Sequence, residues 1–222
     1  EFRRVLFRSF RKFLDNGGYD AFTAHFEVFG QDGRFKQLPF LAASKLLADG
    51  YGYAAEGDSL CAAMVSAAHC LDEGNANFTE MYSMDFKDRA IILCHAGEAN
   101  HATCRIDKKP RLIDKVFLEG GLGNPPTPMF TPQFGRATLT SFVGLCGEKF
   151  RLVVSKGEIL KRDDMRNCEM PYIWYRPDGV METVVENWLR NCGTHHEVIN
   201  LGDCSERWKM LCNMLDVEYV EV

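Results

Sequence analysis

The sequence predicts an α/β protein in two parts, a segment with helices on a mostly parallel sheet and a small antiparallel β-barrel domain after it. Helix-like and strand-like stretches alternate over residues 10–100, which is the pattern of helices packed on a parallel, Rossmann-like sheet. Around Gly120 the run GGLGNPPTPMFTP has too much Gly and Pro for a helix or a central strand. Short strand-like runs follow it, as in small barrels. We therefore expect a partial α/β domain over residues 10–118 and a barrel-like domain over residues 119–222.

The elements of the first part can be placed in order along the chain. Residues 10–16 precede two glycines and predict the end of a helix. Residues 21–29 alternate apolar and polar side chains, which predicts a strand. Residues 39–50 begin with Pro and end with Gly, as helices often do, and residues 59–71 predict a third helix. Residues 89–94 (RAIILC) form a continuous apolar run, typical of a strand buried on both faces.

The second part contains shorter elements. The expected strands are ATLTSFVGL, KFRLVVSK and PYIWYR, and the last strand is VEYVEV. Helices are predicted near residues 181–189 and over residues 205–215, with the run CGTHHEVINLG between them. A helix and a strand are therefore expected to close the second domain.

Composition excludes several classes of protein. The 222 residues include 26 Lys and Arg against 31 Asp and Glu, and 46% are hydrophobic, which is typical of a globular protein with a core. A mildly acidic chain without a segment dense in Lys and Arg is a poor nucleic-acid binder, because phosphate neutralisation supplies much of that affinity. No run reaches the roughly 18 apolar residues of a membrane span, and no leader-like segment opens the chain. We expect a cytoplasmic protein without nucleic-acid or membrane partners.

The cysteines and the first residues need separate interpretations. The nine cysteines are scattered and contain no CxxC pair, so we expect reduced thiols rather than disulfides or a zinc site. Residues 1–9 (EFRRVLFRS) are what GAG TTC AGA CGT GTG CTC TTC CGA TCT encodes, which looks like the end of a common sequencing adapter. We expect these nine residues to be an artefact and the natural protein to extend further. The alternative is a genuine basic amphipathic arm.

Two carboxylates and two imidazoles stand where elements are expected to end, the region in which α/β proteins build their sites. These residues are Glu56, Glu80, His95 and His196. A mixed oxygen and nitrogen set suits Mn²⁺, Co²⁺ or Fe²⁺ with open positions for substrate, and Zn²⁺ less selectively. Spacing alone leaves other roles open. Glu56 could favour the positive end of the next helix, Glu80 could be a solvated charge, and His95 could be a hydrogen-bonded structural residue.

The other histidines differ in what they are expected to do. Neighbouring residues of a strand point to opposite faces, so only one of His195 and His196 should be a metal ligand if this segment is extended. For His25, His69 and His101 we favour structural or solvent roles.

Six segments in succession, FTAHFE, KQLPFLA, DGYGYAAEGD, NFTEMY, LCHAGE and CGTHHEV, resemble the landmarks of the L-arabinose isomerase family. The similarity covers nearly the whole chain from Phe10 and corresponds to the later part of the family's central domain and its C-terminal barrel. The resemblance implies the metal ligands Glu56, Glu80, His95 and His196. It also implies that Phe26, Asp58 and His195 line the sugar pocket.

By this resemblance the protein is a metal-dependent aldose–ketose isomerase that uses Mn²⁺ or another divalent cation such as Co²⁺, and it works as a homo-oligomer. Interconversion of an aldose and its 2-ketose needs negative charge to be stabilised on O1 and O2 of an enediolate, and Glu56 and Glu80 are the candidates for acid and base. Some neighbours depart from the family, because Asp-Ser-Leu-Cys follows Glu-Gly where Asp-Trp-Lys-Thr is common. The sugar is therefore less well defined than the reaction. A non-catalytic sugar-binding relative and another metal-dependent sugar enzyme remain alternatives.

Overall fold

The computed structural model describes residues 2–29, 33–71, 75–116, 122–163 and 168–222. The elements up to residue 71 are α1 (Phe2–Gly17), β1 (Ala21–Ala24), the 3-10 helix η1 (Phe26–Val28), α2 (Phe40–Ala48), β2 (Gly52–Ala55) and α3 (Ser59–Leu71). The middle of the chain contains β3 (Ala76–Asp85), β4 (Ala90–Cys94), the 3-10 helix η2 (His101–Thr103), β5 (Arg111–Asp114) and β6 (Pro126–Met129). The remaining elements are β7 (Gly135–Leu145), β8 (Lys149–Ile159), β9 (Ile173–Pro177), α4 (Met181–Arg190), β10 (His196–Leu201), α5 (Ser205–Leu215) and β11 (Glu218–Glu221).

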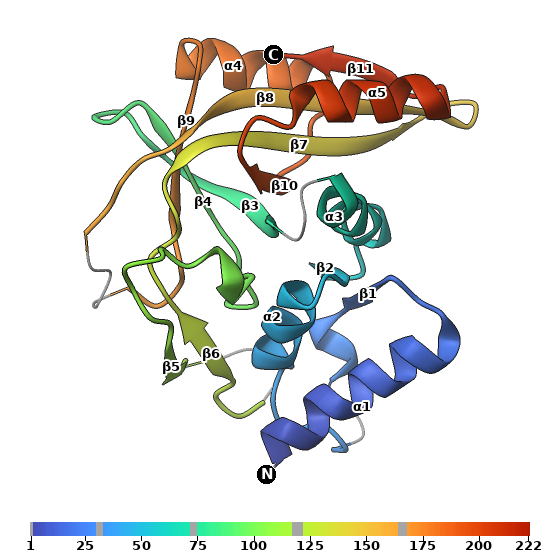
Figure 1. Cartoon of the computed structure of the whole chain (residues 1–222), viewed down its shortest axis with the longest axis vertical. Coiled ribbons are helices and arrows are strands. Elements are labelled where there is room, and N and C mark those ends of the chain that lie inside the picture. The colour runs from blue at the N-terminus through green and yellow to red at the C-terminus, as the bar shows by residue number, and fades with distance from the viewer. Residues whose placement is uncertain (1, 30–32, 72–74, 117–121, 164–167) are drawn as a thin grey trace.

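Helices and a short parallel pair of strands form one end of the molecule. β1 and β2 pair in parallel, and α1 and α2 lie beside them, while α3 lies between this pair and the large sheet (Figure 1). α3 approaches β2 closely because Gly52 has no side chain, and a Cβ built there would be 2.2 Å from the backbone oxygen of Ala62. This contact fixes the direction in which the chain leaves β2 and enters α3.

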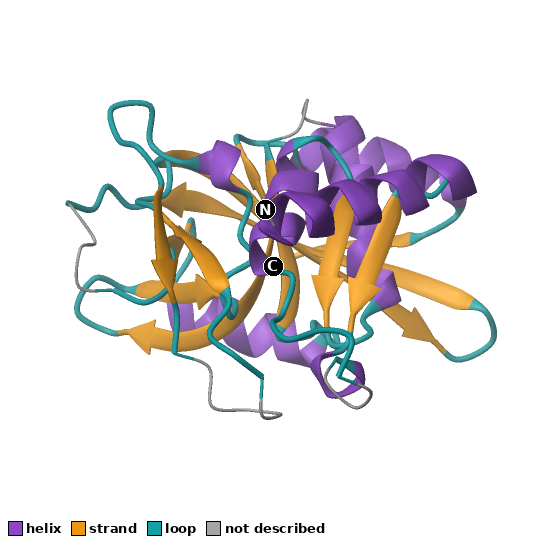
Figure 2. Ribbon diagram, turned by 90° about the horizontal axis from the view of Figure 1, so that it is seen from below, coloured by secondary structure: helices purple, strands orange, loops and turns teal. Residues whose placement is uncertain are grey.

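The rest of the fold is built on a seven-stranded sheet with the order β11-β8-β7-β10-β3-β4-β9. All neighbours are antiparallel except β11 and β8. β9 also pairs with the last residues of β8. The chain of paired strands that starts at β8 and passes through β7, β10, β3, β4 and β9 therefore returns to β8. Figure 2 shows the sheet curling.

The pairing corrects part of the fold prediction. Antiparallel pairing in the later residues is confirmed, but among the described residues of the first part only β1 and β2 are parallel. β3 and β4 are antiparallel neighbours in the large sheet, because only residues 86–89 connect them, and parallel neighbours need a crossover of a dozen or more residues. The expected boundary at residues 118 and 119 lies outside the described residues.

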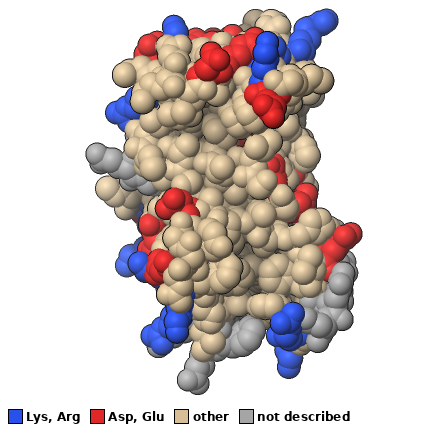
Figure 3. Space-filling model, turned by 90° about the vertical axis from the view of Figure 1, so that its right-hand side faces the viewer, with Lys and Arg blue, Asp and Glu red and all other residues tan. Residues whose placement is uncertain are grey.

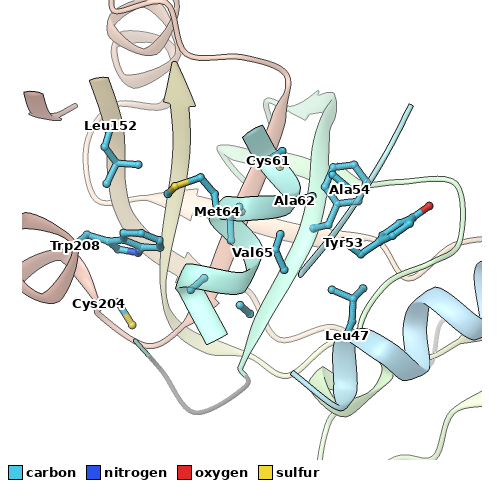
Figure 4. Packing of buried hydrophobic residues seen from close by; sticks show 14 of the residues in the cluster. Leu47, Tyr53, Ala54, Cys61, Ala62, Met64, Val65, Leu152, Cys204 and Trp208 are labelled. Carbon is cyan, nitrogen blue, oxygen red and sulfur yellow. The ribbon is translucent and has the colours of Figure 1, made fainter. Parts of the chain in front are cut away.

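The large sheet has a core on each face. On the α3 side, Val65 of α3, Tyr53 of β2 and Trp208 of α5 pack with the sheet, as Figure 4 shows. Inside the curl, a second cluster includes Ile91, Leu93, Leu139, Tyr175 and Trp188. Successive residues of β10 serve the two cores in turn, since Val198 belongs to the first and Ile199 to the second. This alternation decides which side chains of β10 can reach the α3 side.

The helices predicted over about residues 59–71 and 205–215 are confirmed as α3 and α5. The strand predicted over residues 21–29 is too long, since β1 ends at Ala24. The His25 ring then accepts a hydrogen bond from the Glu27 N–H and caps η1, a local bond that competes with strand pairing. α1 includes most of the segment that looks like adapter sequence.

Figure 3 shows the face that lies on the right of Figure 1. Its Lys and Arg side chains lie toward the two ends, and most of the middle is uncharged apart from a few Asp and Glu side chains. Every helix in the described ranges is too short or too polar to cross a lipid bilayer.

Candidate functional site

Glu56 is presented by the tight turn between β2 and α3. Its backbone is left-handed, with φ of 61°, and Gly57 follows with φ of 84°. The Glu56 N–H donates to the Ala24 carbonyl oxygen at 2.8 Å, and the Gly57 N–H donates to the Thr23 hydroxyl at 3.0 Å. A glutamate in this conformation is strained, and such strain is concentrated at functional sites.

Three adjacent strands bring the other candidates to the same place. In the antiparallel register, Glu80 of β3 lies opposite His196 of β10 on one side and Cys94 of β4 on the other. His95 follows Cys94 directly. Glu80 therefore lies within a strand, where its neighbours are fixed by the ladder, and not in a solvated loop.

The side chains of these residues converge. His95 Nε2 is 4.0 Å from Glu56 Oε1, and His196 Nε2 is 3.8 Å from Glu56 Oε2. One ligand atom from each of Glu56, His95 and His196 lies within 4.8 Å of the others, and the same holds for Glu80, His195 and His196. His195 Nε2 lies 4.0 Å from Glu80 Oε2. The two groups share His196, so the four predicted ligands fall into two clusters that meet at this histidine.

The two adjacent histidines differ in burial although their ring centres are 4.5 Å apart, because β10 begins at His196 and the alternation of a strand does not extend to His195. The His196 side chain is 7% exposed, whereas that of His195 is 68% exposed. The Nε2 atom of His196 is buried and has no hydrogen-bond partner among the described residues. A buried polar atom without a partner is costly. The Nε2 atom of His196 is therefore free to bind a ligand.

Each of the two buried imidazoles is held from behind by a carboxylate. His95 Nδ1 is 2.8 Å from Glu98 Oε1, and His196 Nδ1 is 3.0 Å from Asp58 Oδ2. Burial would lower the pKa of His95, but the carboxylate of Glu98 outweighs it and raises that pKa. The hydrogen bond from His196 lowers the pKa of Asp58.

A pocket opens in front of the Glu56 and His95 side chains. Phe26, Leu38 and Phe40 supply much of its apolar wall. It contains about 400 Å³ of empty volume, including its open mouth.

Of the three residues expected to line a sugar pocket, Phe26 lies in this wall. His195 is exposed beside Glu80, and Asp58 is hydrogen-bonded to His196. Asp58 also borders a second hollow, which His196 lines as well.

The donor set fits a divalent cation. It combines carboxylate oxygens with imidazole nitrogens, which suits Mn²⁺ or Co²⁺, and it contains the unpartnered Nε2 of His196. Nδ1 of each buried imidazole faces a carboxylate, the usual arrangement behind a metal-binding histidine. Cys94 is close by, and burial raises the pKa of its thiol to about 12.

Comparison with known proteins now identifies the family. The model of the L-arabinose isomerase C-terminal domain matches residues 75–218, and that of the L-arabinose isomerase central domain matches residues 5–74. The chain belongs to the L-arabinose isomerase family. An L-arabinose isomerase of Mannheimia succiniciproducens is 30% identical over 216 residues, which is 96% of this chain and 43% of that protein. One of Bacillus subtilis is 32% identical over 213 residues, which is 94% of this chain and 42% of that protein. The chain thus spans less than half the length of these curated relatives.

The change from one L-arabinose isomerase domain model to the other falls at residues 74 and 75, just before β3. β3 and β4 therefore group with the later strands both in the sheet and in the family match.

Sequence reasoning missed two residues of this site. Glu98 is 1% exposed and contacts His95. Phe78 is also 1% exposed, and its ring centre is 4.7 Å from that of His95 and 5.2 Å from that of His196. Phe78 precedes Glu80 by two residues, a spacing that places both on one face of a strand. Only that spacing pointed to Phe78, and for Glu98 only its place three residues after His95.

Proposed function

We propose that this chain carries the catalytic site of a metal-dependent aldose–ketose isomerase, with L-arabinose as the first substrate to consider. The observation that carries the proposal is that Glu56 and His95 cluster with His196, and Glu80 also clusters with His196, whose Nε2 is buried without a partner among the described residues. Membership of the L-arabinose isomerase family supports the reaction class.

Glu56, Glu80, His95 and His196 would hold Mn²⁺ or a similar cation such as Co²⁺. When bound, the cation would act as a Lewis acid toward O1 and O2 of the sugar, the oxygens on the two carbons that change oxidation state. The two imidazoles are neutral nitrogen donors when Nδ1 carries the proton, and each Nδ1 faces a carboxylate that can accept it.

The carboxylates of Glu56 and Glu80 are the proposed acid and base. Isomerisation removes a proton from C2 of the aldose and adds one to C1 of the ketose, and protons also move between O1 and O2. A carboxylate within hydrogen-bond reach of these atoms can take and return a proton. Glu80 is about one-quarter exposed (26%) and Glu56 is 44% exposed, so both can be reached from solvent.

The remaining residues would bind and orient the sugar. Phe26 supplies an apolar surface for the C–H face of the sugar, since it lies in the pocket wall beside Glu56 and His95. The exposed imidazole of His195 beside Glu80 can hydrogen-bond a hydroxyl group. We also propose a homo-oligomer in the cytoplasm, and the exposed apolar side chains Met210, Met214 and Leu215 of α5 would favour association.

The test is chelator-sensitive ketose formation. The chain is incubated with Mn²⁺ and a panel of aldoses that includes L-arabinose and L-fucose, and ketose is measured before and after chelation. Because the relatives are longer, the assay is repeated on the chain joined to the preceding part of the Bacillus subtilis relative. Ketose that disappears on chelation supports the proposal and names the sugar.

Two other results would contradict the proposed reaction. Tight sugar binding without ketose from either protein would indicate a non-catalytic sugar-binding relative. Cleavage of the sugar, or incorporation of water into it, would indicate a different metal-dependent sugar enzyme.

A further inference from the structure

We propose that Glu98 and Asp58 are a matched pair of positioning residues, which keep the proton of His95 and His196 on Nδ1 and so leave both Nε2 atoms free to bind a cation. This inference rests on the proposed metal site and deepens it. It changes the role expected for Asp58, which the family resemblance places in the sugar pocket. It also gives a role to Glu98, which the sequence analysis did not single out.

The contacts of Glu98 leave its carboxylate engaged on both oxygens. Oε1 faces His95 Nδ1 at 2.8 Å, and Oε2 accepts a hydrogen bond from the Gly97 N–H at 2.7 Å. The Tyr53 hydroxyl also donates to Oε1, at 3.4 Å. Glu98 is 1% exposed and borders the pocket beside His95, and because both of its oxygens are already hydrogen-bonded we assign it the role of holding the imidazole.

Asp58 repeats this arrangement for the other imidazole. Oδ2 faces His196 Nδ1 at 3.0 Å, while Oδ1 accepts from the Cys61 N–H at 2.9 Å and so caps α3. One oxygen therefore bonds to the backbone and the other to an imidazole, as in Glu98. Both Nε2 atoms consequently face Glu56, at 4.0 Å for His95 and 3.8 Å for His196.

This shared pattern predicts what an amide would do in either place. In Glu98→Gln, the Gly97 N–H needs an acceptor, so the amide oxygen stays at Gly97 and the NH₂ group turns toward His95 Nδ1. That nitrogen must then accept a hydrogen bond, which moves the ring proton to Nε2. Asp58→Asn does the same to His196, because the Cys61 N–H holds the oxygen. Each substitution keeps the shape of the side chain but blocks one nitrogen ligand.

The first measurement is Mn²⁺ affinity without sugar, from the electron paramagnetic resonance signal of free Mn²⁺. We expect Glu98→Gln and Asp58→Asn each to weaken binding by about 10- to 100-fold. Two matched controls should bind as the unchanged chain does. Glu197→Gln alters a buried carboxyl group on β10, next to His196 in the chain but without a contact to either imidazole nitrogen. Asp203→Asn alters an aspartate that accepts from the Ser205 N–H before α5.

The second measurement is the tautomer of each ring, by nitrogen-15 NMR of the metal-free chain labelled at histidine. We expect the proton on Nδ1 of His95 and His196, with Glu98→Gln inverting only His95 and Asp58→Asn inverting only His196. Asn caps helices as well as Asp does, so Asp58→Asn decides the question even if Glu98→Gln fails to fold.

If the two variants keep the tautomers and the Mn²⁺ affinity of the unchanged chain, the inference is wrong. If Asp58→Asn only raises the KM for the sugar, Asp58 is a residue of the sugar pocket, as the family resemblance implies. Because the tautomers are read without metal or sugar, a chain that makes no ketose can still confirm the positioning role. The failure of the proposed function and the failure of this inference are thus separate results.

Discussion

The turn after β2 and the edge of the large sheet hold their site residues in different ways. His95 follows the end of β4 and His196 begins β10. Their side chains are 8% and 7% exposed, and both rings pack on the ring of Phe78. Glu56 leaves a turn with a left-handed backbone and is 44% exposed. The sheet therefore supplies a rigid, buried half of the site, and the turn supplies a strained, accessible half.

The largest effect should come from the sheet half, where Glu80→Gln removes a proposed acid or base. We expect isomerisation to fall by about 10²- to 10⁴-fold, with the urea midpoint of unfolding unchanged because Glu80 lies at the open edge of the site. Ketose formation at saturating Mn²⁺ and sugar measures the effect. Turnover equal to that of the unchanged chain would remove Glu80 from the mechanism.

The second prediction tests whether the close contact between β2 and α3 at Gly52 holds the turn that carries Glu56. Gly52→Ala places a Cβ 2.2 Å from the Ala62 oxygen and 2.8 Å from the Ser66 nitrogen, both backbone atoms of α3. We expect a loss of about 1–3 kcal/mol in the free energy of unfolding, the usual cost of overpacking, measured by urea denaturation.

Gly144→Ala in β7 is the matched control for this substitution. Its Cβ would meet only the Phe150 ring, at 3.9 Å, so stability should hardly change. Equal losses in the two variants would show that the contact between β2 and α3 is not what holds the turn.

The sequence predicted the elements better than their pairing. The periodicity of residues 59–71 is a local property, and α3 has those bounds. The pairing of β3 with β10 joins residues more than a hundred positions apart, and no local pattern specifies it. The apolar run of β4 suggested a parallel strand, but the short connection from Asp85 to Ala90 decides for an antiparallel one.

For the site, the sequence indicated which residue types could bind a metal, but it did not indicate which neighbours would surround them. Glu56, Glu80, His95 and His196 could be chosen as metal-binding residue types, with a family resemblance to order them. Glu98 could not, because its role depends on the turn at Gly97 that brings its carboxylate back to His95. The strain at Glu56 was equally invisible, since glutamate has no preference for a positive φ.

That strain gives a third prediction, in which stability and function change in opposite directions. Glu56→Gly should raise the free energy of unfolding by up to about 1 kcal/mol, because glycine adopts a positive φ without strain but gains entropy when unfolded. Glu56→Ala should give no such gain. Mn²⁺ binding should weaken in both variants, and urea denaturation with Mn²⁺ titration measures the two effects.

The control is Glu148→Gly, at an exposed position with φ of 58° in the turn between β7 and β8. It should be stabilised by a similar amount without loss of Mn²⁺ binding. Stabilisation of Glu148→Gly alone would mean that the contacts of Glu56 already compensate for its backbone, and the turn would then be no more strained than the sheet.

The smallest effect tests whether the sheet half depends on its surface charges. Arg136 of β7 donates from both terminal nitrogens to the carboxylate of Asp178, each at 2.7 Å, and this lowers the pKa of Asp178. Because the folded pKa lies below the unfolded value of about 3.9, the pair stabilises the fold above that pH and loses its effect as pH falls through the folded pKa. Both side chains are about half exposed, so Asp178→Asn should cost only about 0.5 kcal/mol at pH 7. Urea denaturation of both proteins from pH 7 to pH 2.5 should show this difference shrinking on the acid side. If the difference in the free energy of unfolding stays constant with pH, it comes from packing and not from the ion pair. If the difference is much larger than about 0.5 kcal/mol, surface ion pairs, rather than the strand ladder and the cores, keep the ligand-bearing sheet in register.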